Sequence, residues 1–131
     1  MMANPSEATE RPPGVVIAED ELLLRTLAVE DLEEAGFRTF EAENALAALD
    51  ICKARSGSID VLFTDIRMPG SMDGLELAHR VRERWPGIAI IIVSGNIFVS
   101  RDELPEGASF LPKPYDMRRI VDMVRQLRDV R

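Results

Sequence analysis

Four short apolar runs in this sequence are each followed by polar residues that could bind a metal ion or a phosphate group. In chain order these polar segments are Glu19-Asp20-Glu21, Asp65, Ser94-Gly95 and Pro112-Lys113-Pro114. Carboxylates that converge repel one another unless a cation neutralises them, and hard oxygen ligands favour Mg²⁺ or Mn²⁺ over softer metals. The pattern therefore predicts a divalent-metal site with a serine hydroxyl and an ammonium group beside it.

Asp65 is the candidate nucleophile of this set. It opens a loop rich in glycine and proline, residues 68–74, so its carboxylate should be exposed and fixed in place. An aspartate carboxylate can attack phosphorus and carry the phosphoryl group as an acyl phosphate. Transfer depends on charge neutralisation, which we expect from Mg²⁺ on one side and Lys113 on another, while the Ser94 hydroxyl donates to a phosphoryl oxygen. The flanking prolines make the backbone at Lys113 stiff, and a cis Lys113–Pro114 bond would aim the lysine at the site.

Each of these residues also has a purely structural interpretation. Seen alone, an aspartate after a strand, such as Asp20 or Asp65, more often caps a helix or a turn than acts as a nucleophile. A lysine between prolines is usually part of a surface loop, and Ser-Gly after a strand is usually a turn. Four such signals at four successive strand ends favour a functional site.

The elements that must position these side chains alternate along the chain. Short runs rich in β-branched residues are separated by longer segments of helical period, which predicts an α/β fold with a parallel sheet and crossover helices. The predicted strands are residues 15–18, 37–40, 59–64, 88–93 and 109–111. Ligands bind beyond the carboxyl ends of the strands in such sheets, so the polar segments should share one crevice. Residues 96–107 show a poor helical stripe, so the fourth of about five helices should be short or irregular.

The composition is typical of a single globular domain and argues against several other classes of protein. The 131 residues, 46% hydrophobic and 30% charged, fit one globular domain over residues 14–131, after a tail at 1–13 that we expect to be disordered. No apolar run approaches the roughly 18 residues that span a bilayer. Cys52 is the only cysteine, so an internal disulfide is excluded and a cytoplasmic location without a membrane is expected. The net charge of −7 argues against nucleic-acid binding.

From about residue 15 to residue 127 the chain resembles a response regulator receiver domain of two-component signalling. The motifs that carry the resemblance are Glu19-Asp20-Glu21, Thr64-Asp65-Ile66-Arg67-Met68-Pro69-Gly70, Asp73-Gly74-Leu75-Glu76-Leu77, Val93-Ser94-Gly95 and Lys113-Pro114-Tyr115. The resemblance implies a flavodoxin-like, doubly wound, five-stranded parallel sheet in the order 2-1-3-4-5.

The resemblance also implies roles for the acidic residues. Asp65 would accept the phosphoryl group from the phosphohistidine of a histidine kinase or a phosphotransfer protein. Asp20 and Asp65 would bind Mg²⁺ through their side chains and Arg67 through its backbone carbonyl, while Glu19 would act mainly through an outer-shell water.

Further implied roles concern the phosphoryl group and the response to it. Ser94 and Lys113 would bind the phosphoryl group, and Phe110 would be the aromatic switch that turns inward when Ser94 moves. The chain departs from the family pattern at three of its positions. Glu19 replaces the commoner aspartate, Ser71 is one extra residue in its turn, and Phe110 lacks the hydroxyl of a tyrosine.

The expected function is that of a stand-alone phosphoacceptor domain that signals to a downstream protein by changing shape or drains phosphoryl groups as a sink. We expect no enzyme activity beyond self-phosphorylation and autodephosphorylation, and a monomer or weak homodimer.

One alternative is a small aspartyl-nucleophile phosphohydrolase. Such enzymes commonly place a second carboxylate where this chain has Arg67. Another alternative is a pseudo-receiver that binds partners without phosphorylation, which the presence of Asp20, Asp65, Ser94 and Lys113 disfavours.

Overall fold

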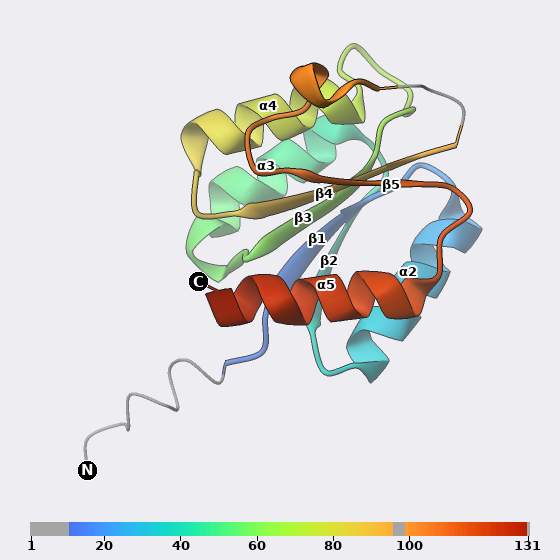
Figure 1. Cartoon of the computed structure of the whole chain (residues 1–131), viewed down its shortest axis with the longest axis vertical. Helices are drawn as coiled ribbons and strands as arrows, with labels where there is room; N and C mark the ends of the chain where they lie inside the picture. Colours follow the sequence, from blue (N-terminus) through green and yellow to red (C-terminus); the bar gives the residue numbers. More distant parts are fainter. Residues whose placement is uncertain (1–10, 96–98, 131) are drawn as a thin grey trace.

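A five-stranded parallel sheet forms the centre of the protein in a computed structural model, which describes residues 11–95 and 99–130. The strands are β1 (Gly14–Ala18), β2 (Arg38–Ala42), β3 (Val61–Asp65), β4 (Ala89–Ser94) and β5 (Ser109–Pro112). Their order across the sheet is β2-β1-β3-β4-β5, which confirms the predicted order (Figure 1). The tail predicted at residues 1–13 lies, up to residue 10, outside the described residues.

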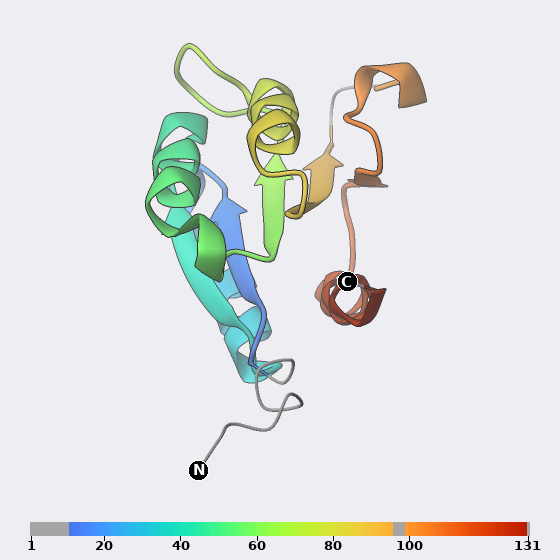
Figure 2. The same ribbon diagram turned by 90° about the vertical axis from the view of Figure 1, so that its left-hand side faces the viewer.

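Helices cover both faces of the sheet because successive residues of each strand point to opposite sides. These helices are α2 (Leu22–Glu34), α3 (Ala45–Arg55), α4 (Gly74–Arg84) and α5 (Met117–Val130). One core cluster joins Val16 and Leu62 to the face of α3 and α4, and the other joins Val15 and Phe63 to the face of α2 and α5. Figures 1 and 2 show these two layers on opposite sides of the sheet. All five residues of β1 and of β3 are buried, as expected for strands covered on both faces.

The connection between β4 and β5 differs from the other crossovers. Among residues 99–108 it holds only the 3-10 turn η2 (Arg101–Glu103), so the described chain has four α-helices and the expectation of about five was slightly high. This agrees with the short or irregular fourth helix predicted for residues 96–107. Residues 96–98 of that segment lie outside the described residues. Ser100 and Glu103 form a capping box around η2, and Nε2 of His79 on α4 lies 2.7 Å from the Glu103 carbonyl oxygen.

The strand register brings the predicted site residues to one edge of the sheet. Ala18, the last residue of β1, pairs with Thr64 of β3, and Asp65 pairs with Val93 of β4. Ser94 in turn pairs with Pro112 of β5. The residues at and just beyond these carboxyl ends therefore face a common crevice. No helix in the described ranges is long and apolar enough to cross a membrane.

Candidate functional site

Three carboxylates meet at the carboxyl ends of β1 and β3. Ligand oxygens of Glu19, Asp20 and Asp65 all lie within 4.8 Å of one another. Glu19 and Asp65 are buried, at 7% and 8% exposure, whereas Asp20 is exposed to solvent. Mg²⁺ binds carboxylate oxygens and usually keeps several of its own water molecules. The exposure of Asp20 leaves room for such waters. The residues therefore fit a magnesium ion.

Lys113 approaches this cluster from the end of β5. Its Nζ lies 2.7 Å from Oδ2 of Asp65 and 3.7 Å from Oε1 of Glu19. The Lys113 backbone N–H donates to the Ser94 carbonyl oxygen at 2.9 Å, and the Lys113–Pro114 peptide bond is cis, as predicted. Ser94 itself is buried at 3% exposure. The structure thus brings together the residues that the sequence pattern singled out.

Burial and neighbouring charges shift the pKa values of Glu19 and Lys113 in this site. Burial raises the pKa of the Glu19 carboxyl above its ordinary 4.5, and the charge of Asp65 adds to this, while the Glu21 N–H and Lys113 partly offset it. Burial alone would lower the pKa of Lys113, but the hydrogen bond and charge of Asp65, with the charge of Glu19, raise it above the ordinary 10.5. One ammonium group lies beside three carboxylates here, and a divalent cation would reduce the repulsion among them.

The backbone of Asp65 is held by contacts that the sequence analysis did not identify. The Thr64 hydroxyl donates to the Asp65 carbonyl oxygen at 2.7 Å. A Cβ added at Gly74, the first residue of α4, would lie 1.7 Å from that same oxygen, so only glycine allows this close approach. The signal in the sequence was Asp73-Gly74 at the start of the helix, where Asp73 Oδ1 caps the N–H of Glu76 at 2.9 Å.

The loop between β3 and α4 borders the site on the side of Asp20. A cavity of about 450 Å³ is lined by Asp20, Ile66, Arg67, Met68, Pro69 and Asp73. Arg67, a predicted backbone ligand, therefore shares this cavity with Asp20. The extra residue Ser71 is exposed in this loop, whereas Met72 is buried at 6% exposure in the core.

Arg25 on α2 is a second residue that the sequence analysis missed. Its Nη1 donates to the Glu19 carbonyl oxygen at 2.8 Å, and its Nε lies 3.1 Å from Oε1 of Glu41. Arg25 is the only basic residue in the sequence of α2, and this single positive charge after three leucines was the available signal.

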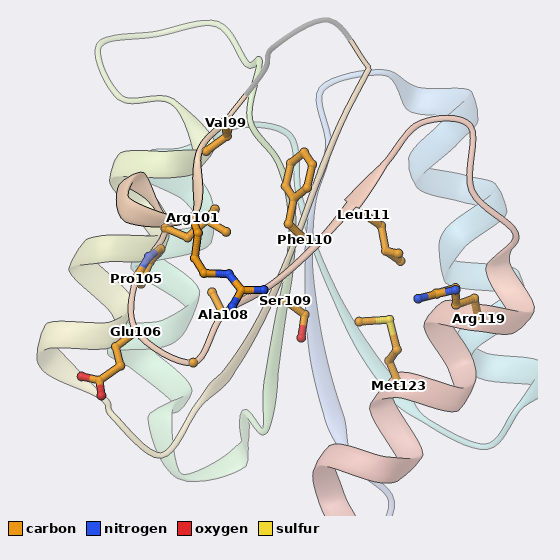
Figure 3. Close-up of a pocket in the computed structure, with 12 residues that line it drawn as sticks. Val99, Arg101, Pro105, Glu106, Ala108, Ser109, Phe110, Leu111, Arg119 and Met123 are labelled. Atoms are coloured by element: carbon orange, nitrogen blue, oxygen red, sulfur yellow. The ribbon is translucent and has the colours of Figure 1, made fainter.

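Phe110 lies on β5, away from the carboxylates. It pairs with Ile92 of β4, two residues before Ser94, and its ring is partly buried. The ring lines a groove of about 820 Å³ between the η2 segment and α5, together with Val99 and Met123 (Figure 3). The strand pairing connects this groove to the Ser94 end of the site, while the switching of Phe110 stays a prediction.

Comparison with known proteins places the chain among signalling domains. Residues 15–125 match the response regulator receiver domain family. The chain is 31% identical over 116 residues to the response regulator receiver protein CpdR of Brucella abortus, covering 86% of this chain and 94% of CpdR. It has the same identity over 116 residues to the sensor kinase CckA of that organism, but there the match spans only 12% of the kinase. A response regulator receiver protein from Sinorhizobium medicae superposes with a TM-score of 0.83 at 26% identity, covering 90% of this chain and 95% of that one.

Proposed function

This chain belongs to the response regulator receiver domain family and is a phosphoacceptor domain of two-component signalling, and we propose that Asp65 takes the phosphoryl group. The observation that carries this assignment is the 2.7 Å contact between Oδ2 of Asp65 and Nζ of Lys113 inside the carboxylate cluster. An ammonium group at this distance can neutralise the attacking carboxylate before the transfer and the phosphoryl oxygens after it.

The proposed reaction is a transfer between two side chains. An oxygen of Asp65 attacks the phosphorus of a phosphohistidine, the new P–O bond forms as the P–N bond to the donor imidazole breaks, and the imidazole nitrogen takes up a proton from solvent. Lys113 then pairs with a phosphoryl oxygen, and the Ser94 hydroxyl donates to another. No general base is needed, because a carboxylate nucleophile has no proton to lose in the attack.

Receiver domains generally bind Mg²⁺ at an acidic pocket, and the acidic cluster of this chain fits that ion. The residues that would hold it are Asp20 and Asp65 through their carboxylates, Arg67 through its carbonyl, and Glu19 through a water molecule. When bound, Mg²⁺ neutralises the charge that develops on the transferring phosphoryl group.

Receiver domains are typically signalling modules without enzyme activity, and they interact with histidine kinases and downstream targets. For this chain we propose residues 14–131 as one receiver unit that works in the cytoplasm as a monomer or weak homodimer. Its phosphodonor would be a histidine kinase or a phosphotransfer protein, and its own chemistry would be limited to self-phosphorylation and autodephosphorylation. The phosphohydrolase alternative gains no support, since such enzymes commonly place a second carboxylate two residues after the nucleophile and this chain has Arg67 there.

Incubation with acetyl phosphate and Mg²⁺, followed by intact-mass spectrometry, tests the assignment of Asp65. The wild type should gain the mass of one phosphoryl group, which hydroxylamine should remove because the product is an acyl phosphate. Asp65→Ala should gain none, whereas Asp50→Ala, a change at an exposed aspartate of α3, should react like the wild type. The same adduct on Asp65→Ala would contradict the assignment.

A further inference from the structure

The backbone just after β1, which carries Glu19 and Asp20, is held by hydrogen bonds on both sides of Glu19. The Glu19 N–H donates to the Ala42 carbonyl oxygen of β2 at 3.0 Å. The Glu19 carbonyl oxygen accepts from Nη1 of Arg25 at 2.8 Å. This carbonyl belongs to the peptide group that joins Glu19 to Asp20, so Arg25 contacts the unit that sets the position of Asp20.

Arg25 makes its second contact at the end of β2. Its Nε lies 3.1 Å from Oε1 of Glu41, and its side chain is only 13% exposed. The planar guanidinium presents its N–H groups in a fixed fork, so one cation connects the loop after β1 to the strand beside it. Glu21, the N-cap residue of α2, makes no side-chain capping bond, and its N–H donates to Oε2 of Glu19 at 3.1 Å.

We propose that Arg25 is a positioning residue for the metal site. By holding the Glu19 carbonyl it fixes the orientation of the peptide group between Glu19 and Asp20. The Asp20 carboxylate is thereby kept close to that of Asp65. This inference rests on the proposed function, because it concerns the same acidic cluster.

Isothermal titration with Mg²⁺ tests this role in the full chain. Arg25→Met keeps an unbranched apolar stem but removes the guanidinium, and it should weaken Mg²⁺ binding about tenfold, the usual effect of losing a partner behind a metal ligand. Arg25→Lys keeps the charge without the fork and should recover part of the affinity. Arg84→Met removes the same charge from the exposed last turn of α4 and should leave the affinity unchanged.

Glu41→Gln provides a variant in which Arg25 itself is intact. It removes the ion pair with Arg25 but leaves the bond to the Glu19 carbonyl, so we expect a smaller loss of Mg²⁺ affinity of about threefold. This variant and Arg25→Lys keep the inference testable if Arg25→Met fails to fold.

Two further measurements separate positioning from simple stabilisation. The phosphorylation rate of Arg25→Met at saturating Mg²⁺ should equal that of the wild type, while the Mg²⁺ concentration for half-maximal rate rises about tenfold. If the unfolding temperature in EDTA falls but Mg²⁺ affinity stays at the wild-type value, the inference is overturned and the proposed function stands. A wild type that binds no Mg²⁺ would instead overturn the proposed metal site and this inference with it.

Discussion

The ammonium nitrogen of Lys113 lies 2.7 Å from Oδ2 of Asp65, so a residue that follows β5 neutralises the carboxylate at the end of β3. Nζ of the same lysine lies 3.7 Å from Oε1 of Glu19. Lys113 therefore competes with any divalent cation for the same carboxylates, while it also supplies the positive charge that phosphoryl transfer needs. These two roles predict opposite effects of its removal.

Lys113→Met should raise Mg²⁺ affinity about threefold, because the competing ammonium group is gone. The rate of phosphorylation by acetyl phosphate should fall about a hundredfold, as when one charge-stabilising donor is lost from a transition state. Calorimetry and intact-mass kinetics measure the two effects, with Lys53→Met at an exposed position of α3 as the control. A general structural defect would lower both quantities together and would contradict the prediction.

Asp20→Ala should weaken Mg²⁺ binding by more than about a hundredfold, since a direct ligand matters more than the residues behind it. Asp20 is exposed, so the urea unfolding curve in EDTA should stay close to that of the wild type. Asp50→Ala removes an equal charge from the surface of α3 as a control. An unchanged Mg²⁺ titration of Asp20→Ala would rule out this residue as a ligand.

Glu19→Gln should stabilise the metal-free protein at neutral pH. The pKa of Glu19 is raised in the folded state, chiefly by burial, so folding becomes less favourable as pH rises from the ordinary 4.5 through the raised pKa. Below the ordinary value the carboxyl is protonated in both states, and the stability difference between variant and wild type should vanish. Urea unfolding in EDTA across this pH range measures it, and a difference that does not depend on pH would count against the prediction.

Gly74→Ala should destabilise the fold by about 2–3 kcal/mol, the upper part of the range for overpacking. The added Cβ would lie 1.7 Å from the Asp65 carbonyl oxygen, and the backbone on both sides leaves little room to move. Gly57→Ala is the matched control because its added Cβ would meet nothing within 4 Å, and it should change stability by no more than about 1 kcal/mol. Equal unfolding midpoints for the two variants would disprove the close contact.

Beryllofluoride with Mg²⁺ should shift the amide signals of residues 99–115 in a two-dimensional NMR spectrum. Ser94 pairs with Pro112, and Phe110 pairs with Ile92, so a movement of Ser94 is transmitted along β5 to the groove of Phe110. The far end of α3, near Lys53, should show little change. A spectrum in which only residues near Asp65 respond would reject this route of signalling.

Local patterns were sufficient to predict the parallel sheet and the meeting of Asp65 with Lys113, whereas the strand order came from the resemblance to the receiver family. Alternating strands and helices indicate a parallel sheet, and polar residues after each strand must then gather at one edge. The contacts of Arg25 and Gly74 could not be predicted in this way, because they depend on how closely separate elements pack. The weak helical pattern before β5 indicated irregular structure, but it did not specify the 3-10 turn that the chain forms.

The extra residue Ser71 has a practical consequence for engineering this chain. The Gly74 N–H donates to the Ile66 carbonyl oxygen at 2.8 Å, which ties the two ends of the loop together, and the burial of Met72 anchors it from within. A change of chain length beside Ser71 should therefore have little effect on the geometry at Asp65. A fluorescent reporter or short epitope grafted beside Ser71 would be carried outside the molecule and leave the phosphoacceptor in register.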